Sequence, residues 1–459
     1  MKSFRTLKPA LLKRELLAAS RGSFPRSFAL CATTTTQRPK VNVRHYSSQN
    51  TAAIESDGLK VEISGGARKR ESLPYFWLRD NCRCASCINQ DTRQRNFDTF
   101  AIPSNIKPLN VSSTAEGVSV KWSDDHQSLY DWDFIQHYVE GDKRDRSVTH
   151  GLHYWGAEIA EQQPTVSFKD VMDSEKGVAE LTAKIQNYGF SFIDSTPSSD
   201  PDLTRQVLER IAFIRLTHYG GFYDFIPDLA MADTAYTNIA LPAHTDNTYF
   251  TDPSGLQAFH LLSHTPPPGV FAETAQGGAS LLVDGFNAAR ILKKEDPKAF
   301  EILSKVRLPW HASGNAGITI TPDRLYPVLE LDEDSGELHR VRWNNDDRGV
   351  VPFGERYGPD EWYGAARKWD EILRRKESEF WVQLAPGRVL GMFAIRRRRG
   401  TWDTNIILKV FDNWRVMHGR SAFEGIRRIC GAYINRDDWI SRWRNTNFDR
   451  KKVLDSVIG

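Results

Sequence analysis

Apolar positions recur with two different spacings along the part of the chain beyond about residue 165. Spacings of three and four residues predict helices over 178–188, 203–211, 286–295 and 362–379. Short alternating or continuously apolar runs, separated by glycine and proline, predict strands over 189–194, 255–262, 279–283, 328–331, 341–343, 388–390 and 428–433. Short strands at irregular spacing are typical of a double-stranded β-helix, or jelly roll. The pattern therefore predicts a mainly β fold with flanking helices over residues 165–447.

A smaller β-rich domain is predicted over residues 55–145, with strands at 60–63, 97–102 and 118–122. Three cysteines, Cys82, Cys84 and Cys87, are spaced so that their thiolates can reach one ion but not form three separate disulfides. In a reducing compartment this spacing favours a structural zinc, with His126 as the fourth ligand. The alternative is a group of ordinary reduced cysteines.

The net charge of +3 averages two unlike segments. Residues 1–50 contain ten Lys or Arg and one acid, Glu15, so the remaining residues carry 51 basic and 57 acidic side chains, a net charge of −6. This balance gives no indication of a nucleic-acid partner. No run of about eighteen apolar residues is present, so we expect no membrane-spanning segment.

The first 46 residues are rich in Arg, Ser, Ala and Thr and poor in acids, with Leu11, Leu12, Leu16 and Leu17 able to line one side of a short helix. This composition predicts a mitochondrial transit peptide over residues 1–46. The alternative is a disordered basic tail.

A His-x-Asp pair, His244 and Asp246, lies near the middle of the chain. Side chains at i and i+2 leave the same face of a strand, so both can bind one metal ion from a single strand end. His418 is the candidate third ligand. Two imidazoles and one carboxylate are the donor set of a non-haem Fe(II) site, which leaves positions open for a cosubstrate and O2. The alternative is a chance pairing in a chain with twelve histidines.

Two further features fit a cosubstrate site. Arg427 follows His418 by nine residues, and a glycine-marked turn at Gly277 leads through Ser280 into an apolar strand. A guanidinium can bind a carboxylate through two parallel hydrogen bonds, which a lysine cannot do. Together these residues predict a 2-oxoglutarate site, with Arg427 and Ser280 as its contacts.

Three segments carry a specific resemblance to a known family: Ala235–Phe250, Asp412–Arg420 and Leu78–Cys87. They resemble the gamma-butyrobetaine/trimethyllysine dioxygenase family of Fe(II)/2-oxoglutarate oxygenases, and the similarity runs from about residue 55 to about residue 445. The resemblance implies a jelly-roll catalytic domain preceded by a small β-rich zinc-binding domain. It also places a zinc histidine at His126.

The resemblance implies how the substrate binds. A quaternary ammonium is held against aromatic faces, and Tyr219, Tyr223, Tyr236 and Tyr433 stand where the family has its trimethylammonium cage. For any one tyrosine alone, ordinary core packing is the alternative. Asp233, Asn344 and Asn345 stand where the family contacts the polar end of its substrate. Asp233 is suited to an α-ammonium, which trimethyllysine has and gamma-butyrobetaine lacks.

The activity implied by the resemblance is hydroxylation of N6,N6,N6-trimethyl-L-lysine at C3, the first step of carnitine biosynthesis. It requires Fe(II), 2-oxoglutarate and O2, with ascorbate as reductant, besides the structural Zn. The expected partner is a small-molecule trimethylammonium amino acid, the expected location is the mitochondrial matrix, and a homodimer is compatible with the resemblance.

Residues 391–409 depart from the family pattern, because relatives are expected to run directly from Leu390 into Val410. The nineteen residues correspond to 57 nucleotides, and their back-translation permits a donor-like GTATGT, a branch-point-like ACTAAC and an acceptor AG. We therefore hypothesise that they are the translation of an unspliced intron. The alternative is a basic surface loop, since long insertions cost little closure entropy.

Three functions remain open from the sequence. The first is the trimethyllysine hydroxylase, and the second is a gamma-butyrobetaine hydroxylase with the same chemistry. The third is a non-catalytic zinc-stapled scaffold whose iron site the insertion has disrupted. Asp233 and the transit peptide favour the first over the second, and the intact triad and Arg427 oppose the third.

Overall fold

The computed structural model of the protein describes residues 50–63, 72–140, 151–227, 237–270, 275–384 and 408–458. The chain divides into two compact units between residues 142 and 143. The predicted transit peptide, the predicted strand at 388–390 and residues 391–407 lie outside the described residues. Among the helices of the described part, none has the length and apolar character that crossing a membrane requires.

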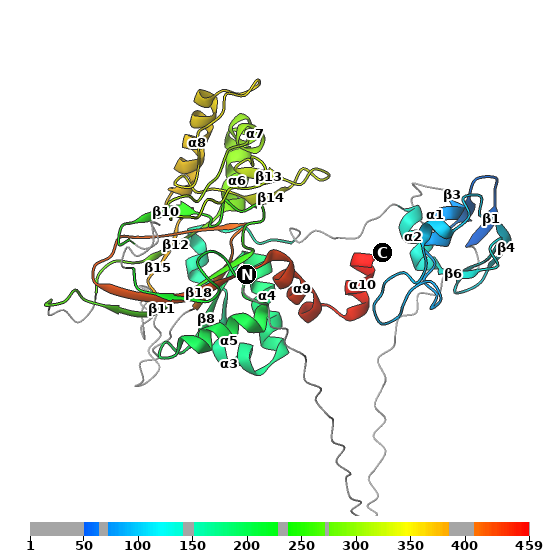
Figure 1. Ribbon diagram of the computed structural model, residues 1–459, viewed down its shortest axis with the longest axis horizontal. Coiled ribbons are helices and arrows are strands. Elements are labelled where there is room, and N and C mark those ends of the chain that lie inside the picture. The colour runs from blue at the N-terminus through cyan, green and yellow to red at the C-terminus, as the bar shows by residue number, and fades with distance from the viewer. Residues whose placement is uncertain are drawn as a thin grey trace, which may run out of the picture. The chain divides into compact units, whose positions relative to one another are not determined.

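The N-terminal unit contains two small antiparallel sheets (Figure 1). Their strands are β1 (Thr51–Ile54), β2 (Leu59–Glu62) and β3 (Ser72–Leu73) in one, and β4 (Pro108–Ser113), β5 (Gly117–Trp122) and β6 (Gln127–Asp131) in the other. Helices α1 (Tyr75–Asp80) and α2 (Trp132–Val139) pack with them around a core that includes Leu78 and Trp122. The predicted strand at 97–102 is wrong: Asp98 accepts a hydrogen bond from the Phe100 amide and starts a 3₁₀ turn over Thr99–Ala101.

Two sheets form the centre of the second unit. The larger has the order β7 (Thr165–Ser167), β8 (Phe190–Asp194), β16 (Leu408–Asp412), β11 (Leu256–Thr265), β18 (Ile426–Ile434) and β9 (Tyr223–Phe225). All neighbours are antiparallel except β7 and β8. The smaller has the order β10 (Leu241–His244), β17 (Val416–Arg420), β12 (Ser280–Asp284) and β15 (Phe380–Val382). Residues of both sheets share one apolar cluster, which includes Phe192, Leu282 and Phe411. This is the jelly-roll arrangement.

Helices cover the outer faces of both sheets, as Figure 1 shows for α6 to α8 on one side and for α3 and α5 on the other. The larger sheet packs against α3 (Phe168–Asp173), α4 (Glu175–Tyr188), α5 (Pro201–Ile211) and α9 (Arg436–Asn447). The smaller sheet packs against α6 (Gly285–Glu295), α7 (Pro297–Lys305), α8 (Pro359–Leu373) and the β13 (Leu329–Leu331) and β14 (Leu338–Val341) hairpin. The 3₁₀ helix η2 (Ala157–Glu161) and α10 (Arg450–Ile458) complete the unit.

Two predicted elements of this unit have different bounds. Helix α8 ends at Leu373 rather than 379, because a turn leads from it into β15. Strand β14 ends at Val341, so the predicted strand at 341–343 is wrong beyond its first residue. The Arg342 side chain instead bonds the carbonyls of Thr248 and Phe250, the latter at 2.8 Å.

Alternation along the strands decides which side chains lie between the sheets. In β16, Leu408 and Val410 join the outer core with the helices, so Lys409 and Phe411 face inward. In β17, Met417 joins the outer core, so His418 faces inward. The polar inner positions lie together at one part of the space between the sheets, and there they form the candidate site.

Candidate active site

The three predicted metal ligands lie together. Antiparallel pairing of β10 with β17 sets His244 opposite His418, with ring centroids 4.3 Å apart. Asp246 lies two residues beyond the end of β10, and its Oδ1 is 3.2 Å from His244 Nε2 and 3.8 Å from His418 Nε2. One ligand atom from each residue lies within 4.8 Å of the others. His244 and Asp246 are far from His418 in the sequence, yet all three could bind the same metal ion.

Neighbouring groups orient these ligands. His244 Nδ1 donates to the Pro242 carbonyl at 2.8 Å, which leaves Nε2 directed at the cluster. The Asp246 Oδ2 atom accepts from Gln257 Nε2 at 2.6 Å and from the Tyr433 hydroxyl at 2.8 Å. Asn413 holds the Asp246 main chain from both sides, at 2.8 and 2.9 Å. The carboxylate therefore has one oxygen tied to the protein and one facing the imidazoles.

The electrostatics of the cluster suit a divalent cation. Burial favours the neutral form of Asp246, but the His418 and His244 imidazoles outweigh it and hold the pKa of the carboxyl well below its usual range. Burial, with His244 adding to it, lowers the pKa of His418 well below its ordinary value. Burial also opposes the charged form of His244, but the hydrogen bond and charge of Asp246 outweigh it and raise the pKa of His244, so a metal ion would displace a proton there. A charged carboxylate and a neutral imidazole are the forms that bind a metal. The donor set and its one-sided arrangement fit Fe(II).

A small cavity of about 80 Å³ adjoins the cluster on one side and is lined by Ser280, Lys409, Arg420 and Arg427. Arg427 is 3% exposed, and its Nε and Nη1 have no hydrogen-bond partner in the part of the chain that the structure describes. Buried donors without partners are costly, so they mark a place for an anionic ligand. The buried guanidinium in this cavity therefore suits a carboxylate, and Arg427 and Ser280, which the sequence predicts as 2-oxoglutarate contacts, both line it.

Lys409 is a member of this cavity that the sequence analysis did not assign. Its side chain is 4% exposed, and Nζ donates to the Ser280 hydroxyl at 3.2 Å. Burial, and after it the Arg427 charge, lowers the pKa of Lys409 to about 7. No described carboxylate forms an ion pair with it. Lys409 is the last residue of the stretch 391–409. A predicted strand beginning at Leu408 would have placed its side chain on the inward face by alternation.

A larger cavity of about 360 Å³ adjoins the cluster and carries most of the predicted substrate residues. Tyr219, Tyr223, Tyr433 and Asn344 line it, and the rings of Tyr223 and Tyr433 lie 5.9 Å apart. The Tyr223 hydroxyl donates to the Ala258 carbonyl at 2.7 Å, so its ring is fixed beside the cavity. Part of this wall is therefore aromatic, as a quaternary ammonium requires.

Other predicted substrate residues are placed differently. Asp233 and Tyr236 lie outside the described residues. Asn345 is exposed, accepts a hydrogen bond from Arg348 Nε at 3.1 Å, and lines a neighbouring cavity instead of the one with the tyrosines. Tyr433 lines the cavity with the tyrosines, and its hydroxyl also donates to Asp246 Oδ2, a contact that no local sequence pattern predicts.

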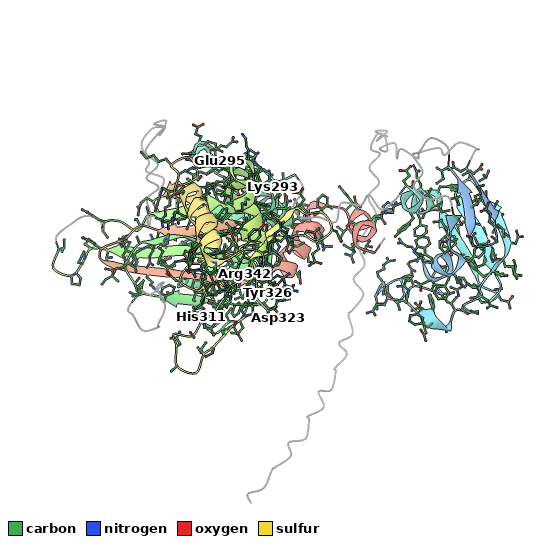
Figure 2. The ribbon with its side chains drawn as sticks, turned by 90° about the horizontal axis from the view of Figure 1, so that it is seen from above. Lys293, Glu295, His311, Asp323, Tyr326 and Arg342 are labelled. Atoms are coloured by element: carbon green, nitrogen blue, oxygen red, sulfur yellow. The ribbon has the colours of Figure 1, made fainter. Side chains whose placement is uncertain are left out.

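The loop after β10 is held by a buried arginine. Arg342 is 1% exposed and pairs with Glu330 at 3.0 Å. Its guanidinium lies 4.3 Å from the centre of the Tyr326 ring, and the two residues lie beside each other in Figure 2. Because it also bonds the carbonyls of Thr248 and Phe250, it fixes the segment that carries Asn247 and Tyr249 to the cavity.

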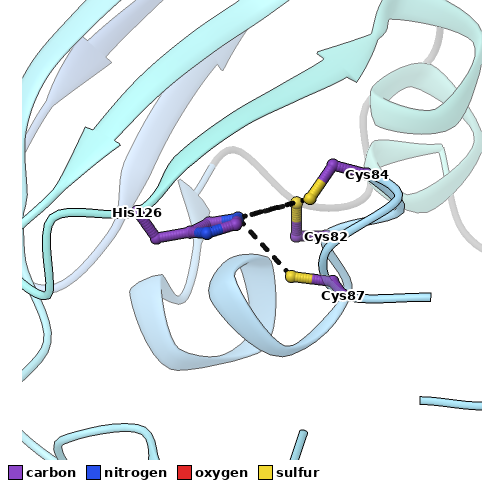
Figure 3. Close-up of side chains that lie close together, drawn as sticks. All are labelled: Cys82, Cys84, Cys87 and His126. Carbon is purple, nitrogen blue, oxygen red and sulfur yellow. Dashed lines mark hydrogen bonds between the residues drawn. The ribbon is translucent and has the colours of Figure 1, made fainter. Parts of the chain in front are cut away.

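The N-terminal unit holds a second cluster of metal-ligating side chains, shown in Figure 3. The sulfurs of Cys82, Cys84 and Cys87 lie 3.3, 3.7 and 3.5 Å from His126 Nε2. The cysteines follow α1, and the histidine lies in the turn between β5 and β6. Burial, and after it the Cys82 charge, raises the pKa of the Cys87 thiol to about 12. Three thiols and one imidazole around one point fit a tetrahedral zinc site.

Two family models match the chain, one over each of its two compact units. Residues 145–392 match the family described as taurine catabolism dioxygenase TauD, TfdA family. Residues 52–136 match the gamma-butyrobetaine hydroxylase-like N-terminal family. The first match ends before His418 and Arg427, which the structure nevertheless brings to the same site. The jelly-roll sheets, the His–Asp–His cluster and the match to this family define the class of protein, a dioxygenase enzyme.

Individual relatives narrow the class. The chain is 61% identical to trimethyllysine dioxygenase of Neurospora crassa over 436 residues, 89% of this chain and 88% of that protein. It is 37% identical to the mitochondrial trimethyllysine dioxygenase of Homo sapiens over 374 residues, 81% of this chain and 82% of that protein. Identity to gamma-butyrobetaine dioxygenase of Pongo abelii is 29% over 407 residues, 84% and 96% of the two chains. The chain belongs to the trimethyllysine dioxygenase family.

Proposed function

We propose that this protein uses Fe(II), 2-oxoglutarate and O2 to hydroxylate N6,N6,N6-trimethyl-L-lysine at C3, as the first step of carnitine biosynthesis. The observation that carries the proposal is one His–Asp–His cluster between two cavities of opposite character. The smaller cavity contains the basic side chains of Arg420 and Arg427, and the larger contains tyrosines and carboxylates. A dicarboxylate and a cationic substrate would each find a matching wall next to the same ion.

The side chains would divide the work as follows. His244, Asp246 and His418 would hold the metal, with Gln257 and Tyr433 keeping the carboxylate in place. Arg427 would pair with the far carboxylate of 2-oxoglutarate, and Ser280 would add a hydroxyl contact. Iron and 2-oxoglutarate supply the oxidising chemistry, in which O2 is consumed and succinate and CO2 are released. Ascorbate would serve as the reductant that keeps iron ferrous.

The substrate would be held at both ends. Tyr219, Tyr223 and Tyr433, together with Tyr236, would surround the trimethylammonium group, each contact contributing about 0.5–2 kcal/mol. Asn344 would contact the polar end, where Asp233 and Asn345 are also proposed. Because the aromatic wall adjoins the metal cluster, the alkyl chain between the two ends would pass beside the ion.

The test is a turnover assay with Fe(II) and 2-oxoglutarate that offers trimethyllysine and gamma-butyrobetaine separately. We expect 3-hydroxytrimethyllysine and stoichiometric succinate with the first substrate and much slower turnover of the second. The reverse preference would favour gamma-butyrobetaine hydroxylation. Absence of turnover in both the complete chain and a version lacking residues 391–409 would favour the non-catalytic scaffold.

Residues 391–409 are proposed to be the translation of an unspliced intron. Their removal joins Leu390 to Val410 and so puts a leucine at the register position of the buried Lys409, and Val389 at that of outward-facing Leu408. Both replacements suit the apolar surroundings of β16. Sequencing of cDNA tests the proposal: a dominant transcript that retains the 57 nucleotides would refute it.

Two further proposals concern the N-terminal part. A structural zinc would bind Cys82, Cys84, Cys87 and His126, and we expect one zinc per chain by elemental analysis and loss of it in Cys87→Ser. Residues 1–46 would direct the protein to the mitochondrial matrix, in line with the mitochondrial names of the animal relatives. A reporter fused to residues 1–50 that stays cytosolic would contradict this.

The third proposal is that the protein forms a homodimer. Measuring the mass of the protein in solution tests it.

A further inference from the structure

The turn that leads into β12 brings two basic side chains of the smaller cavity together. A side chain at Gly278 would have its Cβ 3.2 Å from Arg427 Cζ, so the guanidinium lies against this glycine. Two residues further on, the Ser280 hydroxyl accepts a hydrogen bond from Lys409 Nζ at 3.2 Å. Arg427 comes from β18 and Lys409 from β16, the two strands that flank β11. A ligand bound beside this turn would therefore meet both side chains.

The Lys409 amino group has no anionic partner of its own. The residue is 4% exposed, and among the described residues the Ser280 hydroxyl is the one hydrogen-bond acceptor of Nζ. The rings of Phe259 and Phe411 lie 5.1 and 5.9 Å from Nζ. Asp246 is the one carboxylate in the described lining of this cavity, and it belongs to the metal cluster. An ammonium group has three hydrogens to donate, so a buried one is costly unless a ligand accepts the others.

Neighbouring charges determine how readily Lys409 holds its proton. Burial, and after it the Arg427 charge, lowers the pKa of Lys409 to about 7, and Arg420 acts in the same direction, whereas Asp246 opposes them. A carboxylate placed beside the amino group would favour its protonated form. The cavity is thus able to provide a second charged donor when a carboxylate binds in it.

We propose that Lys409 is a cosubstrate-binding residue whose ammonium group pairs with the far carboxylate of 2-oxoglutarate alongside Arg427. The inference rests on the proposed function and adds a binding residue to it. It also gives residues 391–409 a functional consequence, because their removal puts a leucine at this register position. A chain without the insertion would bind the far carboxylate through Arg427 and Ser280 alone.

The experiment compares two 2-oxo acids on the complete chain loaded with Mn(II) in the absence of O2. 2-Oxoglutarate carries the far carboxylate, and 2-oxopentanoate has the same carbon chain without it. Lys409→Met keeps the length and apolar stem of the side chain and removes the amino group. We expect this variant to weaken 2-oxoglutarate binding about 20-fold and to change 2-oxopentanoate binding less than about twofold, as measured by calorimetry. Lys305→Met is the matched control at an exposed lysine that ends α7, and it should change neither affinity.

A second variant separates charge from packing. Lys409→Leu introduces the residue that the shorter chain would carry, and it should weaken 2-oxoglutarate binding as much as Lys409→Met does. Equal losses of both 2-oxo acids in either variant, or no loss of 2-oxoglutarate binding in Lys409→Met, would overturn the inference. Failure of the proposed function is distinguishable, because the unmodified chain would then show no metal-dependent binding of either 2-oxo acid.

Discussion

The two cavities beside the His–Asp–His cluster share the lining residues Phe225, Leu241, His244, Asp246 and Phe259, but their other polar and charged lining residues all differ. The smaller one, about 80 Å³, carries Lys409, Arg420 and Arg427. The larger one, about 360 Å³, carries tyrosines and carboxylates and no described lysine or arginine. Under the proposed function, charge would separate the two organic ligands: the basic cavity would attract 2-oxoglutarate and repel a trimethylammonium group, and the larger cavity would do the reverse.

The difference also shows how one fold builds two unlike sites. The basic cavity is made from inward positions of strands in both sheets, which carry Ser280, Lys409 and Arg427. The larger cavity is partly made from loops, which supply Asn344, Asp347 and His311. Rigid strands suit a ligand that is the same in every oxygenase of this chemistry, and loops suit the part that distinguishes substrates.

The largest effect is expected where the two cavities meet. His244→Ala removes a ligand shared by both, so we expect loss of bound metal and a fall in turnover of roughly 1000-fold or more. Metal content after anaerobic loading and succinate release are the measurements. His264→Ala is the matched control. His264 lies near the C-terminal end of β11, lines neither cavity, and donates a hydrogen bond from Nε2 to the Glu424 carbonyl. Retained metal and turnover in His244→Ala would refute the ligand set.

A second substitution affects only the basic cavity. Arg427→Ala should weaken 2-oxoglutarate binding about 100- to 1000-fold, because a buried two-pronged partner of a carboxylate is removed. Trimethyllysine binding in the presence of saturating 2-oxoglutarate should change little. Arg428→Ala is the control, because that neighbour pairs with Asp224 at 2.6 Å and is absent from the cavity lining. An equal effect in both variants would contradict the assignment.

A third change concerns the buried cation of the insertion. The folded chain holds the pKa of Lys409 at about 7, chiefly through burial, and an unfolded lysine titrates near 10.4. Between these values the unfolded chain binds more protons, so the free energy of unfolding of the unchanged protein rises with pH across this window. Lys409→Leu should therefore be more stable by about 2 kcal/mol at or below pH 7, and this gain should shrink toward pH 10.

Denaturant unfolding of the complete chain and of Lys409→Leu at pH 6.5 and pH 9.5 measures this gain. Lys452→Leu, in the C-terminal helix α10 and exposed, is the control and should show no such pH dependence. A gain that is constant with pH would mean that Lys409 keeps its proton throughout the range.

The smallest effect is expected for a substitution in the aromatic wall of the larger cavity. Tyr223→Leu removes one ring of the aromatic wall and should weaken trimethyllysine binding by about 1 kcal/mol, roughly fivefold. Tyr223→Phe keeps the ring and loses the hydrogen bond to the Ala258 carbonyl, so its effect on binding should be smaller. Calorimetry with both variants distinguishes the two, and equal losses would show that the hydroxyl rather than the ring matters.

Much of this molecule could be predicted from local pattern. The helices at α4, α5 and α6 and the strands β8, β12 and β18 follow from spacings of 3.6 and 2 residues, because burial of one face imposes those periods. The metal ligands could be proposed because a His-x-Asp pair and a distant His carry their chemistry in their residue types. The errors at 97–102 and 374–379 lie where a side-chain cap or a turn outweighed the apolar pattern.

Local pattern alone therefore indicates which faces are buried and which residue types are available for chemistry. The fold in three dimensions is needed to show that His244 lies opposite His418, that Lys409 enters the basic cavity, that Asn345 stays outside the larger cavity and that Asp347 lines it. Periodicity is a property of neighbouring residues, whereas these contacts depend on strand register and loop paths between residues far apart in the chain.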